Sequence, residues 1–314
     1  MLRFLLLRVL TTIPVLVLVT FVVFGLVLLI PGDPAVTIAG PDATVEQVAA
    51  IRERLGLDRP LLVQYWDWVT SAMAGDLGTS LYTSRAVATS IGDALPVSMA
   101  LAGAALLISL VIAVPMAIVS ALRRGTWVDR VATLGSSLGI ALPSFWLGLV
   151  FVLIFSLTLG WLPATGYVPF AQDPVAWLTH LVLPALTLGI AGAAESTRQL
   201  RGSIIGVLQQ DYVRTARAKG LRGRMVVGKH VMKNASVPLV TVLGLQITAL
   251  LGGAVLVEQV FGVPGLGQVA IAAVTTRDIP VIQGIVLIAV LVAVVCNLLV
   301  DLVYGYLNPK VRPR

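Results

Sequence analysis

The chain has 314 residues, of which 58% are hydrophobic and only 12% are charged. A soluble domain carries about 25% charged residues, so this chain cannot cover a water-exposed surface with polar groups, and a soluble globular protein is excluded. The single cysteine, Cys296, excludes an internal disulfide framework and a cysteine metal cluster, and the presence of only two histidines argues against a His-rich metal site.

The first apolar segment covers residues 9–30 and contains no charged residue. As a helix it would be about 33 Å long, which is enough to cross a hydrocarbon core of about 30 Å. Arg3 and Arg8 ahead of it would also suit a signal peptide. However, the apolar run is longer than a typical signal core, and no small-residue cleavage site follows it. We therefore expect a permanent membrane span, ended by the Pro-Gly-Asp-Pro sequence at residues 31–34.

Five further apolar segments give six predicted spans in total. Pro115, Pro143 and Pro184 fall inside three of them, which is tolerated where neighbouring helices or water satisfy the freed carbonyl groups. The five segments are residues 97–122, 131–159, 177–194, 237–257 and 281–304.

Basic residues are concentrated in alternate loops, all on one side of the membrane. By the positive-inside rule, that side and both termini are cytoplasmic. The net charge of +7 is then a consequence of topology, and no nucleic-acid partner is expected. Seventeen of the 22 Lys and Arg residues follow this pattern: Arg3, Arg8, Arg123, Arg124, Arg130, Arg198, Arg201, Arg214, Arg217, Lys219, Arg222, Arg224, Lys229, Lys233, Lys310, Arg312 and Arg314.

The segment between the first two spans is predicted to lie outside the cytoplasm and to contain two short helices. Thr44 with Gln47 forms a capping box for a helix that Gly56 would end. Residues 60–73 would form an amphipathic helix, either on the membrane surface or against the bundle. We divide the chain into an N-terminal helix with this region (1–94), a permease domain (95–304) and a cytoplasmic tail (305–314).

Three sequence patterns resemble catalytic motifs but lack the required context. Residues 223–230 resemble a phosphate-binding loop, yet His230 stands where Ser or Thr must ligate magnesium. Residues 135–139 match a nucleophile elbow but fall inside a predicted span, where small residues favour close helix packing. Residues 265–270 match a dinucleotide-binding pattern without the strand that must precede it, and we expect a turn after span five.

The loop between spans four and five contains a predicted short helix at about residues 211–220. Asp211 can cap its start, Lys219 suits its last turn, and Gly220 can adopt the left-handed conformation that ends a helix. Small residues at positions 215, 216 and 218 would let a partner surface approach closely. The alternative is a solvated basic loop that only fixes the topology.

This segment resembles the coupling helix of ABC importer permeases. Their general pattern is Glu-Ala-Ala, three residues, then Gly. Here the sequence runs Arg214-Thr-Ala216-x-x-x-Gly220, which is similar to the variant of the dipeptide and oligopeptide permeases. Further segments resemble the same family in order along the chain, including residues 31–34, 55–60, 75–80, 143–148 and 258–267.

The resemblance implies an all-α, polytopic type I ABC importer permease in the bacterial cytoplasmic membrane. Such a chain is not an enzyme and holds no cofactor, because ATP and Mg²⁺ bind to partner subunits. The implied partners are a second, homologous permease, two ATPase subunits or domains and an extracytoplasmic solute-binding protein, besides membrane lipid and a peptide cargo. The residues expected to contact the ATPase are Tyr212, Arg214, Thr215, Ala216, Lys219 and Gly220.

The translocation pathway is less strongly indicated by the sequence. Proline, polar and glycine residues within spans three and five could line or kink it, or could serve only helix packing: Pro143, Gln246, Thr248, Gly252 and Gly253. The cargo could also be nickel, glutathione, haem or another solute. A secondary transporter driven by an ion gradient is a further alternative, although the ionisable residues available to it lie only near span ends.

Overall fold

A computed structural model describes residues 2–28, 34–40, 43–54 and 56–307. Within these ranges all the regular secondary structure is helical, apart from an isolated β-bridge between Thr79 and Ala86, which confirms the predicted all-α class. The elements are α1 (Leu2–Leu28), α2 (Pro34–Ala39), α3 (Val45–Arg54), α4 (Leu61–Met73), α5 (Val87–Leu122), α6 (Trp127–Ala141), α7 (Ser144–Phe151), the π-helix η1 (Val152–Thr158), α8 (Pro174–Leu208), α9 (Asp211–Ala218), α10 (Gly223–Met225), the π-helix η2 (Val226–Val231), α11 (Met232–Phe261), α12 (Leu266–Thr276) and α13 (Ile279–Leu307).

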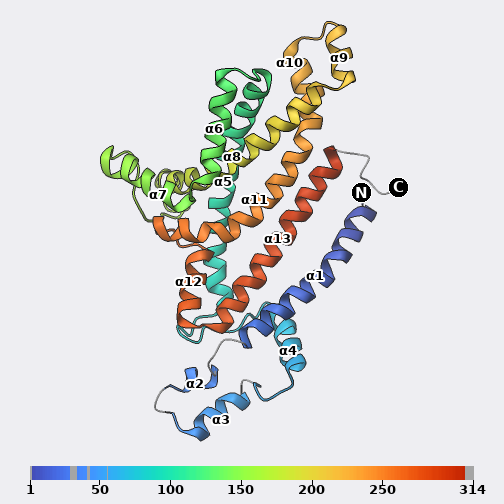
Figure 1. The fold of residues 1–314 in the computed structure, drawn as a ribbon. Helices are drawn as coiled ribbons and strands as arrows, with labels where there is room; N and C mark the ends of the chain where they lie inside the picture. The colour runs from blue at the N-terminus through green and yellow to red at the C-terminus, as the bar shows by residue number, and fades with distance from the viewer. Residues whose placement is uncertain (1, 29–33, 41–42, 55, 308–314) are drawn as a thin grey trace.

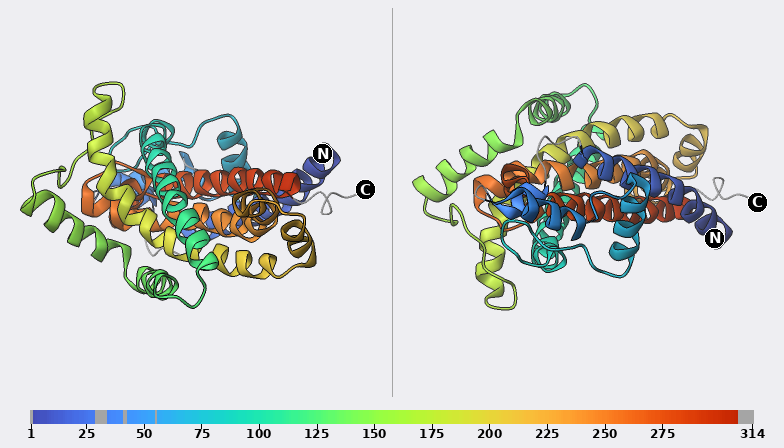
Figure 2. Two further views of the ribbon diagram at one scale, coloured as in Figure 1. Left: turned by 90° about the horizontal axis from the view of Figure 1, so that it is seen from above. Right: turned by 90° about the horizontal axis from the view of Figure 1, so that it is seen from below.

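The long helices form an elongated bundle (Figure 1). α9 and α10 lie at one end, which we call the basic end, and α2 and α3 lie at the other. Figures 1 and 2 show α7 and η1 projecting from the side of the bundle away from α1 and α13. This arrangement places the predicted coupling segment at the tip of α8 and α11. It lies far from the part of the chain between α1 and α5, with α2, α3 and α4, which we call the outer segment.

By length and composition, α5, α8 and α13 are each able to cross a membrane alone. Two bent pairs, α6 with α7–η1 and the two parts of α10–α11, raise the count to as many as five spans in the described residues. α1 has 27 residues, but its described apolar part, Leu10–Gly25, is shorter than a full span. The sixth span therefore remains a prediction.

The predicted third span is not one continuous helix. α6 and α7–η1 meet at an angle of 104°. The break lies at Leu142 and Pro143, whose ψ angles of 130° and 134° are extended. Proline offers no backbone N–H, and it pushes the preceding residue out of the helical region, so α6 ends at Ala141. Pro115 and Pro184 have no such effect and lie within α5 and α8.

α8 continues far beyond the predicted end of span four, to Leu208. The prediction ended at residue 194 because charged residues follow. Those residues are compensated within the structure, since Glu195 pairs with Arg198 at 2.8 Å and Arg201 pairs with Asp129 at 2.7 Å. The helix can therefore extend to the basic end and present α9 there.

The central packing joins α5 to α8 through small residues. A side chain at Gly189 of α8 would lie 2.7 Å from Ile108 and 2.9 Å from the carbonyl oxygen of Ala105. Gly139 of α6 is similarly close to Ala194, at 2.8 Å, as close helix packing requires. Gly135, predicted to share that packing face, has no neighbour within 4 Å among the described residues of this chain and takes no part in this contact.

The outer segment is fixed to the bundle by α4. The Tyr65 hydroxyl lies 2.9 Å from the Thr20 hydroxyl, and the Tyr65 ring packs against Phe21 and Phe24 of α1. Of the two predicted placements of this amphipathic helix, the structure shows the one against the bundle. The predicted capping box is also present, because the Gln47 backbone N–H donates to Thr44 Oγ1 at 3.3 Å.

The close contact at Gly189 predicts that adding a side chain at this residue destabilises the protein. Gly189→Ala should lower the free energy of unfolding by about 1–3 kcal/mol, because the added methyl group would collide with α5. The matched control is Gly202→Ala in the same helix, where nothing lies within 4 Å of the added carbon. Thermal unfolding of the detergent-solubilised protein measures both; equal midpoints for the two variants would contradict the packing described.

Candidate functional site

α9 is a two-turn helix with defined ends. Its N-cap is Gln210 and not the predicted Asp211, which is the first helical residue and forms a 3.4 Å ion pair with Arg214. Gly220 follows the helix with a φ angle of +76°, and its backbone N–H donates to the Arg217 carbonyl. The predicted left-handed helix end is therefore confirmed.

One face of α9 anchors it to the bundle. Val213 and Ala216 are buried, and they belong to the same apolar cluster as Leu200 and Ile204 of α8. Asn234 Nδ2 of α11 donates to the Tyr212 hydroxyl at 2.9 Å. α9 is therefore attached to both long helices that lead into the membrane region.

The other face of α9 is exposed. Among the six residues predicted to contact an ATPase, Arg214, Thr215, Lys219 and Gly220 are exposed, and Tyr212 is partly so at 44%. Ala216 lies instead on the anchored face, 6% exposed. The structure thus leaves five of these residues exposed and turns the sixth inward.

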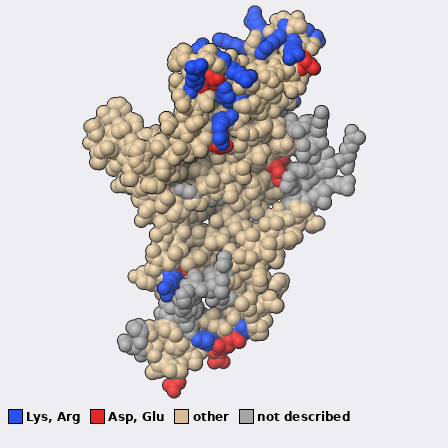
Figure 3. All heavy atoms as spheres, in the orientation of Figure 1, with Lys and Arg blue, Asp and Glu red and all other residues tan. Residues whose placement is uncertain are grey.

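The basic end is rich in exposed cations (Figure 3). Such a surface favours an acidic partner, because complementary charges steer association. The exposed cations around α9 are Arg214, Arg217, Lys219, Arg222, Arg224, Lys229 and Lys233. The segment at 223–230 that resembles a phosphate-binding loop is helical, formed by α10 and η2, with Val226 buried.

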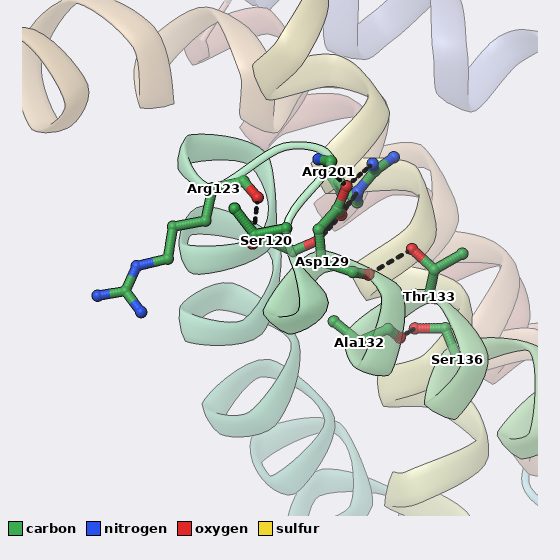
Figure 4. A network of polar contacts seen from close by, with 9 residues as sticks. Ser120, Arg123, Asp129, Ala132, Thr133, Ser136 and Arg201 are labelled. Carbon is green, nitrogen blue, oxygen red and sulfur yellow. Dashed lines mark hydrogen bonds and ion pairs between the residues drawn. The ribbon is translucent and has the colours of Figure 1, made fainter.

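A polar cluster that sequence reasoning missed joins α5, α6 and α8 (Figure 4). Asp129 accepts two hydrogen bonds from the Arg201 guanidinium, at 2.7 and 2.8 Å, and one from the Ser120 hydroxyl at 2.5 Å. The Gly125 backbone N–H adds a fourth, at 2.9 Å. The sequence explains Arg201 only as one of the cations that set the topology. The sequence feature that could have indicated the pair is Asp129, the sole acidic residue among residues 123–130.

A second polar cluster explains the glycine-rich segment after α11. The Glu258 side chain is 1% exposed and accepts hydrogen bonds from the Ser98 hydroxyl at 2.6 Å and the Gly267 backbone N–H at 2.7 Å. A side chain at Gly265 or Gly267 would collide with this carboxylate. The carboxylate thus caps the start of α12 and ties it to α5, which is a structural role.

The predicted pathway residues lie in different surroundings. Gln246 lines a cleft of about 290 Å³ between α5, α8 and α11, and Ser144, next to Pro143, also lines it. Thr248 donates to the Gly244 carbonyl at 3.2 Å and does not line the cleft. The exposed Gly252 and the neighbouring Gly253 fall where two parts of α11 meet at 52°, and the surroundings of Gly253 lie outside the described residues.

No group of three or more His, Cys, Asp or Glu residues that could hold a metal ion occurs in the described part of the chain. Of the buried carboxylates described above, Asp129 is paired with Arg201, and Glu258 accepts hydrogen bonds from Ser98 and from backbone N–H groups.

Two family patterns match the chain. The pattern of the binding-protein-dependent transport system inner membrane component covers residues 113–313. The pattern of the N-terminal part of binding-protein-dependent transport system membrane components covers residues 1–102. Together they account for nearly the whole sequence.

Proteins with similar sequences carry transport names. The chain is 41% identical over 305 residues to a Brucella abortus protein provisionally named as a peptide transport system permease, with 97% of each chain covered. It is 43% identical over 312 residues to the glutathione transport system permease protein GsiC of Salmonella choleraesuis, with 99% of each covered.

Solved structures share the fold. A structure of the MetNI methionine ABC transporter in inward-facing conformations matches 70% of this chain and 96% of its own, with a TM-score of 0.56 and 15% identity. An amino acid ABC transporter crystallised with histidines matches 69% of this chain and 94% of its own, with a TM-score of 0.53 and 16% identity.

The family patterns and the similar sequences show that the chain belongs to the family of binding-protein-dependent transport system inner membrane components, as a multi-pass, non-catalytic permease subunit of an ABC importer.

Proposed function

We propose that this chain is the peptide-translocating permease of an importer energised by ATPase subunits that dock on the exposed face of α9. The observation that carries the proposal is the division of α9 into an anchored face, with Val213 and Ala216, and an accessible face, with Arg214 and Lys219. A helix held in this way can receive a force from outside and pass it to α8 and α11. Family membership excludes the alternative of a transporter driven by an ion gradient.

The route of the force follows from the contacts. α9 packs on α8 through Leu200 and Ile204, and the Arg201–Asp129 pair joins that part of α8 to α6. On the other side, Tyr212 is linked to Asn234 near the start of α11. Closure of partner ATPase domains on ATP would therefore move α6, α8 and α11 together, as a two-state element biased by ATP binding.

The proposed topology has six spans, including α1, with both termini in the cytoplasm. It is supported by the concentration of Lys and Arg around α9 and at the α5–α6 turn (Figure 3). α1 begins and α13 ends toward that same basic end (Figure 1). The outer segment with α2, α3 and α4 would then face the solute-binding protein, and a second homologous permease would complete the pathway.

The proposed cargo is a peptide, and the names of the similar proteins support it, because one refers to peptides and the other to glutathione. Glutathione is itself a tripeptide, so both names refer to a cargo that contains peptide bonds. Within the importer, the binding protein would make the first selection, and the permease would have to pass whatever peptide is delivered.

The position of Gly220 predicts a coupling defect. Gly220→Val should lower ATP-dependent peptide uptake by about tenfold or more, because a β-branched residue at φ +76° costs upwards of about 1–2 kcal/mol and would displace the end of α9. The reconstituted complex should insert normally and hydrolyse ATP without matching uptake.

Gly223→Val provides the control for this experiment. Gly223 is exposed, has no neighbour within 4 Å and does not have a positive φ angle, so the same side chain should be accepted there. Full substrate-stimulated uptake by the Gly220→Val complex would show that α9 is not the coupling element.

The topology predicts opposite locations for two sites. A reporter enzyme that works only outside the cytoplasm should be active when fused after residue 60, which precedes α4, and inactive when fused after residue 222, which follows α9. A reporter that works only in the cytoplasm should give the reverse result. Fusions that report the same side at both positions would contradict the proposed topology.

A further inference from the structure

The cleft between α5, α8 and α11 contains two polar atoms that have no hydrogen-bond partner in the described structure. They are the hydroxyl oxygen of Ser109 and the amide oxygen Oε1 of Gln246. Both residues line the cleft, and Ser109 is only 1% exposed. Buried polar atoms without partners are rare and costly, above all at membrane depth, and so each calls for a physical explanation.

The orientation of the Gln246 amide is fixed by its other contacts. Its nitrogen Nε2 donates to the Gly192 carbonyl at 2.8 Å and to the Ser196 hydroxyl at 3.0 Å. A reversed amide would place two carbonyl oxygens against each other, because the Gly192 oxygen can only accept. Oε1 therefore remains an acceptor on the other side of the amide group.

Gly192 leaves open the position that both unpaired atoms face. A side-chain carbon built on Gly192 would lie 3.1 Å from Ser109 Oγ and 3.2 Å from Gln246 Oε1. The absence of a side chain at this residue thus brings a hydroxyl donor and a carbonyl acceptor to one small space beside α8.

A secondary amide complements this pair. Its carbonyl oxygen can accept from the Ser109 hydroxyl, and its N–H can donate to Gln246 Oε1. Neither protein group is charged, and Glu195, the carboxylate that lines the same cleft, is paired with Arg198 at 2.8 Å. The site therefore suits the peptide bond common to all peptides better than any charged side chain.

We propose that Ser109 and Gln246 form a site that binds a peptide bond of the cargo during translocation. This inference rests on the proposed function. Ser109 lies near the middle of the 36-residue α5, which is where transporters commonly place substrate contacts. The 52° bend of α11 begins within about one turn after Gln246, so a bound peptide would contact α11 close to the point where it changes direction.

The first test is Ser109→Ala in the complete reconstituted importer, with trialanine as the probe. Because the Ser109 hydroxyl bonds to nothing in the protein, its removal should leave the unfolding temperature unchanged or raise it. Loss of a hydrogen bond to cargo should nevertheless raise the KM for uptake roughly three- to tenfold. If the hydroxyl had a purely structural role, its removal would lower the unfolding temperature and leave the KM for uptake unchanged.

The second test separates the two halves of the site. An ester analogue of trialanine that lacks an amide N–H should be taken up less well than trialanine by the unmodified importer. Gln246→Leu should reduce that preference, because Gln246 Oε1 is the group that accepts from the N–H. Thr248→Val is the control, since the Thr248 hydroxyl is already bonded to Gly244 and Thr248 does not line this cleft.

The outcomes distinguish this site from the function on which it rests. An unchanged KM in Ser109→Ala, or an unchanged preference in Gln246→Leu, would show that water alone satisfies these atoms and would overturn the site while leaving peptide import intact. Absence of ATP-dependent uptake of trialanine and glutathione by the unmodified importer would overturn both proposals. A raised KM with unimpaired stability, together with a reduced preference, supports the site.

Discussion

The Arg201–Asp129 ion pair determines how the rest of the basic end is held. The Asp129 side chain is only 8% exposed, and its carboxylate receives hydrogen bonds from three separate segments. Removing one partner from such a pair leaves a buried charge without compensation, which typically costs about 3–5 kcal/mol. Arg201 lies in α8 ten residues before α9, so the pair fixes to α6 the part of α8 that leads to α9.

The two polar clusters have a common design. At the basic end, Asp129 joins α5, α6 and α8; farther from that end along α5, Glu258 joins α5, α11 and α12. Each carboxylate satisfies backbone N–H groups at a turn or helix start that would otherwise be unpaired in apolar surroundings. Between them, the cleft at Gln246 is the place where polar groups remain open. Helices joined by fully hydrogen-bonded carboxylates, with unpaired polar atoms in the cleft between these two clusters, are consistent with a subunit that moves as a unit and binds its cargo transiently.

Sequence reasoning predicted those features that depend on local chemistry. The capping box at Thr44, the helix α4 and the left-handed Gly220 are set by residues close together in the chain, and all three are present. The charge pattern also predicted where cations gather. The match of family patterns to residues 1–102 and 113–313 confirms the resemblance inferred from short motifs.

The remainder depends on contacts between distant segments. Pro143 ends a helix whereas Pro115 and Pro184 do not, and the sequence around them does not distinguish these outcomes. The burial of Ala216 follows from packing against α8, and Ser109 becomes notable only because Gln246 and Gly192 lie beside it.

The attachment of α4 to α1 has a consequence for biogenesis. Tyr65 and Thr20 are separated by 45 positions, so their contact is available while most of the chain is still to be synthesised. Asp278, which binds the Ser80 hydroxyl and the Leu81 backbone N–H, follows those residues by almost 200 positions. The outer segment is therefore attached twice, first to α1 and later to the turn before α13, and the second attachment can form only after synthesis has reached residue 278.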